Sequence, residues 1–204
     1  MAYANWITPS KLSGSGNDTV NISANSSNTG RSARSTTVTF KAANCSDVVR
    51  TVNQAGKPEF VSFDNNTASV AKAGGSVTIT GKSNSSKLTF SLGSGGTLVI
   101  SLPSSYTANS VSTNNGASIS GDPGASAEYV FSITISNIPA NTSVSALTKQ
   151  LIVTDNASDS ATCTISQAAG DATLSVSPAS VTIPWDASED KSFTVTSNTS
   201  WTVE

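Results

Sequence analysis

Side chains suited to catalysis are few in this sequence and widely spaced. The 204 residues include no histidine, so the chain has no imidazole base, no histidine metal ligand and no Ser-His-Asp triad. The two cysteines, Cys45 and Cys163, are too few for a thiolate zinc site. We therefore expect neither enzyme activity nor a cofactor.

Acidic residues gather in two short segments, 155–159 and 186–190. Loop carboxylates can bind Ca²⁺ through about six to eight oxygens, but neither segment has a recognised ligand spacing. A glycosidase needs two carboxylates in one pocket, and no pocket-forming apolar stretch accompanies these. The spacing favours solvated turns over a calcium site.

The three tryptophans are the remaining candidates for ligand contact, because an aromatic face can stack on a sugar ring or pack in a core. For Trp6 and Trp201 both roles are open from the sequence pattern alone. Trp185 follows Ile183 and Pro184 in a turn. An exposed turn tryptophan suits a partner contact or a glycan platform, and simple loop packing is the alternative.

Charge and hydropathy exclude other partners. Charged residues make up 12% of the chain, the net charge is −2, and the 11 Lys and Arg form no basic run, which argues against nucleic acid as a partner. No apolar run approaches the length of a membrane span.

Residues 1–6 resemble no signal peptide. Cys45 and Cys163 fall in different segments, so we expect two free thiols and a reducing place of synthesis.

Short alternating segments recur about every ten residues and are separated by Gly, Asn, Ser and Pro. Alternation of period two predicts strands with one buried and one polar face. Representative segments are 19–22, 37–40, 76–80, 87–90, 129–135, 150–153, 162–165 and 192–196. The sequence therefore predicts an all-β protein built from Ig-like antiparallel β-sandwich modules.

An internal repeat defines the modules. Residues 51–56 align with 164–170, and 28–38 align with 141–151. Residues 1–56 are thus expected to be the C-terminal half of a module whose complete copy is 57–170.

Residues 171–204 resemble the opening of that complete copy. Ser192–Thr196 aligns with Ser76–Thr80, and Trp201–Val203 aligns with Leu88–Phe90. We therefore predict one complete sandwich, flanked by two complementary halves of another.

Each half would leave an apolar face in water and a strand edge unpaired, which favours their association. The halves could close within one chain, or between chains by strand complementation. The second route is favoured, since tandem modules with short linkers usually stack end to end. The expected seam comprises Trp6, Ile7, Val20, Ile22, Val38, Phe40, Phe193, Val195, Trp201 and Val203.

Placed in the order 171–204 then 1–56, the two halves resemble the BACON family, Ig-like modules common in Bacteroidetes and named for carbohydrate binding. The motifs that carry the resemblance are Trp201–Val203, Trp6–Ile7, Ser13–Gly16, Asn28 with Arg31 or Arg34, and Gln54–Gly56. The central copy matches less closely, because Leu88 replaces the first tryptophan and 106–116 forms an insertion.

The resemblance implies two functions. BACON-type modules also occur on the capsids and tails of phages of gut Bacteroidetes, so we expect a non-enzymatic capsid decoration or other virion protein. It would be made in the bacterial cytoplasm and assembled with itself and with a capsid or other virion protein. The alternative is a carbohydrate-binding module that uses Trp185 to recognise host or dietary glycans.

Overall fold

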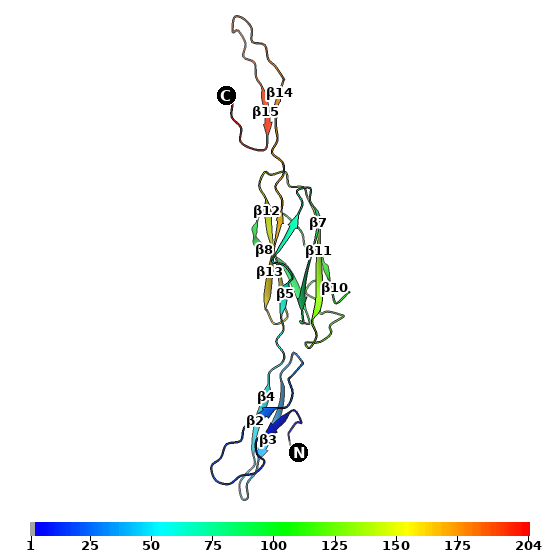
Figure 1. Cartoon of the computed structure of the whole chain (residues 1–204), viewed down its shortest axis with the longest axis vertical. Helices are drawn as coiled ribbons and strands as arrows, with labels where there is room; N and C mark the ends of the chain where they lie inside the picture. The colour runs from blue at the N-terminus through cyan, green and yellow to red at the C-terminus, as the bar shows by residue number, and fades with distance from the viewer. Residues whose placement is uncertain (1–2) are drawn as a thin grey trace.

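The computed structural model describes residues 3–204 (Figure 1). It contains fifteen β-strands within that range and no helix there, so the predicted all-β fold is confirmed. The first two residues of the expected fragment 1–56 lie outside the described residues. Along the molecule, a small N-terminal unit and a C-terminal hairpin lie at opposite ends of a central sandwich.

Two facing sheets form the central sandwich, residues 57–170. One sheet has the order β10-β9-β11-β7-β5 and the other the order β6-β13-β12-β8. All neighbouring strands are antiparallel except β6 and β13. The bounds are β5 Val61–Phe63, β6 Thr67–Val70, β7 Gly75–Ser83, β8 Leu88–Gly96, β9 Ser105–Ala108, β10 Val111–Asn114, β11 Tyr129–Ile138, β12 Leu147–Asp155 and β13 Ser160–Gln167.

The alternating residues of these strands fill a closed core. Phe131 contacts Phe63 and Phe90 edge to face, with ring centroids 5.8 and 5.7 Å apart. The inward residues of β11 and β12 are almost completely buried. Burial also raises the pKa of Tyr129 to about 12, and its hydroxyl donates a 2.7 Å hydrogen bond to the carbonyl oxygen of Ser85. The sandwich therefore needs no further strand to close its interior.

The N-terminal unit consists of two hairpins. Strands β1 (Ile7–Pro9) and β2 (Ile22–Ala24) pair with each other, as do β3 (Arg34–Phe40) and β4 (Val48–Gln54). Its buried apolar residues are few, with Ile7 and Val38 the main ones. The expected strand at 19–22 is shorter than predicted and begins at Ile22.

The C-terminal segment forms one hairpin, β14 (Leu174–Ser177) with β15 (Thr194–Ser197). Residues 201–203, expected as a strand, pair with no other strand within the described chain. Alternation alone gives an extended segment, and a strand needs a partner edge that supplies its hydrogen bonds.

Candidate assembly surface

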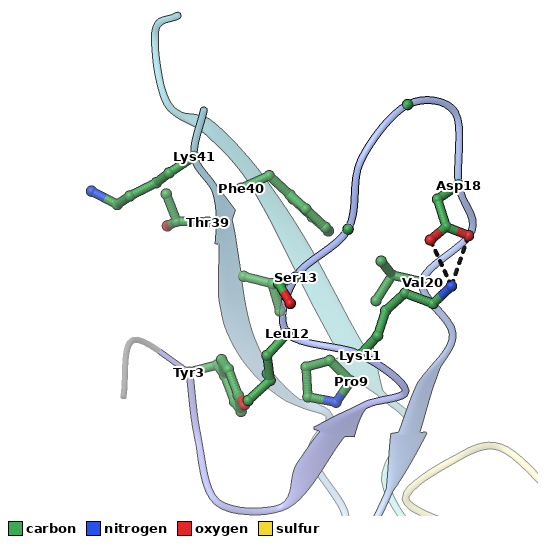
Figure 2. A pocket seen from close by; sticks show the side chains of 13 residues that line it. Tyr3, Pro9, Lys11, Leu12, Ser13, Asp18, Val20, Thr39, Phe40 and Lys41 are labelled. Carbon is green, nitrogen blue, oxygen red and sulfur yellow. Dashed lines mark hydrogen bonds and ion pairs between the residues drawn. The ribbon is translucent and has the colours of Figure 1, made fainter. Parts of the chain in front are cut away.

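The N-terminal unit has an open apolar groove where a sandwich would have its core (Figure 2). The groove has a volume of about 440 Å³ and is lined by Tyr3, Pro9, Leu12, Val20, Val38 and Phe40, among others. Leu12 is 81% exposed and Phe40 42% exposed. The Lys11 ammonium bonds the Asp18 carboxylate at 2.7 Å at the rim. One sheet face of this unit is therefore uncovered.

The C-terminal segment exposes its apolar residues even more. Phe193 and Trp201 are each about half exposed, and Val203 is 84% exposed. Val195 is half-buried in the hairpin. Hydrophobic burial contributes about 1.5–3 kcal/mol for each large side chain, so this face is unfavourable in water.

The N-terminal unit repeats the bonding of the central sandwich at a spacing of 113 residues. Asn28 donates from Nδ2 to the carbonyl oxygens of Ser32 and Ala55. Asn141, 113 positions later, donates in the same way to Ser145 and Ala168. The asparagine ties the loop before the hairpin to its end in both copies.

The strand register repeats as well. Val38 stands opposite Arg50 in the β3–β4 hairpin, and Leu151 stands opposite Cys163 in β12–β13. The hairpin 34–54 is thus the structural counterpart of 147–167. In the central sandwich both outer edges of that hairpin are occupied, by β6 and β8. In the N-terminal unit, within the described residues, no strand pairs with either edge.

The C-terminal hairpin repeats the opening of the central sandwich. Asn84 accepts from the Phe60 amide at 2.8 Å and donates to the Pro58 carbonyl at 3.0 Å. Asn198 accepts from the Thr173 amide and donates to the Asp171 carbonyl, each at 2.8 Å.

These bonds correct the sequence alignment of the C-terminal segment. They place Asn198 at the position of Asn84, so Thr194–Ser197 corresponds to Thr80–Ser83 and Phe193 to Ile79. The alignment of Ser192–Thr196 with Ser76–Thr80 is therefore displaced by two residues. A shift of two keeps Phe193 on the same face of the strand.

The residues predicted to meet at the seam are separated in this structure. Trp6, Ile7, Val20, Ile22, Val38 and Phe40 lie in the N-terminal unit, and Phe193, Val195, Trp201 and Val203 lie at the other end of the molecule. Within the described chain, no strand of 171–204 pairs with a strand of 3–56. The intrachain closure considered above is not formed here.

A partly buried ion cluster joins the N-terminal unit to the central sandwich. The Arg31 guanidinium forms two 2.7 Å bonds to the Asp122 carboxylate and contacts Glu59 at 3.2 Å. It also donates to the Asn84 carbonyl oxygen. The guanidinium holds the pKa of Asp122 below its usual value, and Asp122 raises the pKa of Arg31. Arg31 belongs to the family motif, but no motif points to this contact, since Asp122 lies 91 positions away and beyond the insertion 106–116.

The three tryptophans differ in their surroundings, and Trp201 is about half exposed in the C-terminal segment. Trp185 is 98% exposed in the turn after Ile183. Trp6 is half-buried, and the Arg34 guanidinium carbon lies 4.7 Å from its ring centroid, a cation–π arrangement. Arg34 also donates to the Gln54 side chain at 2.8 Å. Arg34 thus links the two hairpins of the N-terminal unit.

Neither acidic segment forms a metal centre. Asp155 accepts from the amides of Ala157 and Asp159, both at 2.9 Å, which is an ordinary turn cap; burial raises its pKa. Asp186 caps its own turn through the Ser188 amide. Across residues 3–204, no cluster of three or more His, Cys, Asp and Glu side chains could hold a metal ion.

Among the described residues, no helix has the length and hydropathy to cross a membrane. Cys45 is exposed, Cys163 is buried, and both are free thiols.

The fold defines an all-β protein with a central Ig-like β-sandwich. Residues 1–55 match the family model of BACON, described as "Putative binding domain, N-terminal". This match confirms the BACON resemblance for residues 1–55. No curated protein matches the chain.

Proposed function

We propose that this chain is a structural protein that assembles head to tail, the C-terminal segment of one copy completing the N-terminal BACON unit of the next. The carrying observation is that both ends expose residues whose counterparts are buried in the central sandwich. Phe40 corresponds to Val153 and Trp201 to Leu88, and both of those central residues have no exposed surface. Hydrophobic burial would drive the two faces together.

Closure between copies fits the shape of the molecule better than closure within one chain. The two uncovered faces lie at opposite ends of the central sandwich (Figure 1). The connectors, Lys57–Pro58 and Asp171–Ala172, each reach only about 7 Å at about 3.3 Å per residue. The Arg31 cluster further fixes one of these junctions. A heterologous contact of this kind forms a ring or a filament.

Light scattering coupled to size exclusion tests the assembly. We expect a mass that rises with concentration, and we expect Phe40→Asp to reduce it to that of a monomer. Val130→Asp is the matched control, because Val130 is similarly exposed but lies on β11 of the complete sandwich. A wild-type chain that stays monomeric at all concentrations would overturn the proposal.

We further propose that the assembly decorates a phage particle and contacts a capsid or other virion protein. The support is the likeness of residues 1–55 to BACON-type modules, which occur on such particles. Mass spectrometry of gradient-purified virions should detect the protein at a fixed copy number relative to the capsid protein. Recovery only from the soluble fraction of the lysate would contradict this location.

Glycan recognition is the second candidate, and the exposure of Trp185 favours it. A fully exposed aromatic ring offers a stacking face for a sugar. If the assembly binds glycans, binding on an array of mucin and plant polysaccharides should be lost in Trp185→Ala and kept in Val99→Ala, the control at an exposed apolar residue of the central sandwich. No signal from the wild-type chain would eliminate this candidate.

A further inference from the structure

We propose that a second copy of this chain adds strands to both edges of the β3–β4 hairpin in one defined register. In that register Val203 lies opposite Phe40, and Ser180–Ile183 runs parallel to Thr51–Gln54. The inference rests on the head-to-tail assembly proposed above and specifies its partner surface residue by residue.

The central sandwich supplies the template. Its sheet β6-β13-β12-β8 has the hairpin β12–β13 in the middle, with β8 antiparallel on one side and β6 parallel on the other. Both flanking strands begin within residues 58–91, the part of the module that 171–204 repeats at the 113-residue spacing. The hairpin β3–β4 has the same bonds and register as β12–β13, so it presents the same two edges.

The antiparallel edge fixes the first contact. In the central sheet Val153 pairs with Phe90, and Thr154 pairs with Thr89. Val153 and Thr154 correspond to Phe40 and Lys41 by the 113-residue spacing. Phe90 and Thr89 correspond to Val203 and Thr202, because Trp201–Val203 has the same apolar–polar–apolar pattern as Leu88–Phe90. The segment between Asn198 and Trp201 is therefore one residue shorter than the segment between Asn84 and Leu88.

These equivalences orient the incoming strand. Val203 then faces Phe40 on the core side, and Thr202 faces Lys41 on the solvent side. The strand 201–203, unpaired in the single chain, gains its partner edge at β3.

The parallel edge fixes the second contact. Residues Thr67–Val70 run alongside Thr164–Gln167, with the Ala168 amide donating to the Val70 carbonyl. Their counterparts are Ser180–Ile183 and Thr51–Gln54. Ile183, 63% exposed in this chain, then takes the place of Val70, which is buried in the central core.

The opposite sheet supplies an independent third contact. Ile133 pairs with Ile79 in the central sandwich. Their counterparts are Val20, which lines the groove, and Phe193. The incoming Phe193 therefore enters the groove of Figure 2 from the side of Val20.

The same register brings Trp185 to the junction with the next copy. Trp185 occupies the position of Lys72, whose ammonium bonds Asp171 at 2.7 Å in the central sandwich. Pro58 occupies the position of Asp171. The exposed tryptophan thus lies beside the connector of the neighbouring copy, where a proline can pack against it.

Disulfide trapping in the full chain tests this register. In a Cys45→Ser background, one preparation carries Lys41→Cys and another carries Thr202→Cys, both outside the core. Oxidation of the mixture should give a covalent dimer, since paired strand residues approach within disulfide range. Each variant alone should stay monomeric on a denaturing gel. The matched control is Lys41→Cys mixed with Val203→Cys, whose thiols face opposite sides of the sheet.

The outcomes separate the register from the assembly. A Lys41–Thr202 dimer that is lost in the control mixture supports the register. Assembly by light scattering without that disulfide, or with a stronger disulfide in the control, overturns the register and leaves head-to-tail assembly standing. An absence of assembly in the Cys45→Ser parent overturns both. A single chain carrying both new cysteines that forms only an internal disulfide would show intrachain closure instead.

Discussion

Arg31 is the residue on which the position of the N-terminal unit most depends. It reaches from the loop before β3 to Asp122, Glu59 and the Asn84 carbonyl oxygen of the central sandwich. All three charged side chains are less than a quarter exposed. An ion pair that is partly buried and bidentate stabilises more than an exposed one.

Replacement of this arginine should therefore weaken the junction in a pH-dependent way. We expect Arg31→Ala to lower the free energy of unfolding by about 1–2 kcal/mol at neutral pH. The folded-state pKa of Asp122 is depressed, so the stabilisation is present above the unfolded pKa and is lost as the pH falls through the folded one.

Urea denaturation at neutral pH and at about pH 3 measures this difference. The gap between wild type and Arg31→Ala should narrow at the lower pH. Lys11→Ala, which breaks the exposed pair with Asp18, is the control and should change stability little. An equal gap at both pH values would contradict the role assigned to the ion pair.

At the scale of elements, an asparagine after the second strand of a pair bonds the backbone before the first strand in two places. Asn84 does so for β5 and β7, and Asn198 for β14 and β15. Asn84 is completely buried, whereas Asn198 makes its corresponding bonds in an exposed hairpin. The same hydrogen bond contributes more to the free energy of unfolding where water cannot replace a lost partner.

The two asparagines should respond differently to replacement by alanine. We expect Asn84→Ala to destabilise the central sandwich by about 2–3 kcal/mol, because the Phe60 amide loses its buried partner. Asn198→Ala should change the stability of the monomer by less than about 1 kcal/mol and should weaken assembly. Thermal unfolding of dilute protein and light scattering of concentrated protein separate the two effects. Equal destabilisation of the dilute monomer would show that the C-terminal hairpin already has a closed core.

At the scale of the whole molecule, the two ends that expose apolar side chains lie on opposite sides of the closed sandwich (Figure 1). In the proposed assembly, the N-terminal end accepts strands and the C-terminal end donates them. Such a unit propagates without limit unless rotation closes a ring. A chain truncated after residue 170 keeps the accepting face and loses the donor.

Truncated chains should therefore act as caps. We expect small additions of the 1–170 chain to shorten wild-type assemblies in electron micrographs, in proportion to the amount added. A 1–170 chain that also carries Phe40→Asp is the control and should leave their length unchanged. Equal shortening by both would point to a different contact surface.

Much of the fold could be predicted from the sequence. Period-two alternation with Gly, Asn and Pro between the segments determines strands and turns, because it matches the two faces of a pleated strand. The 113-residue repeat determines which hairpins are equivalent, since Asn28 and Asn141 sit at the same point of the same turn. The BACON resemblance of residues 1–55 was available from the same residues.

The tertiary structure decided the rest. Residues 201–203 have a strand pattern and no strand partner in the single chain, and the exposure of Phe40 and Trp201 depends on what covers them. The alignment of Phe193 was corrected by two residues from the hydrogen bonds of Asn198. The alternating pattern alone fits both alignments equally well, because they differ by one period of a strand. The Arg31–Asp122 contact joins residues 91 positions apart. Alternation specifies which face of a strand is apolar, whereas only the three-dimensional arrangement specifies which other surface that face meets.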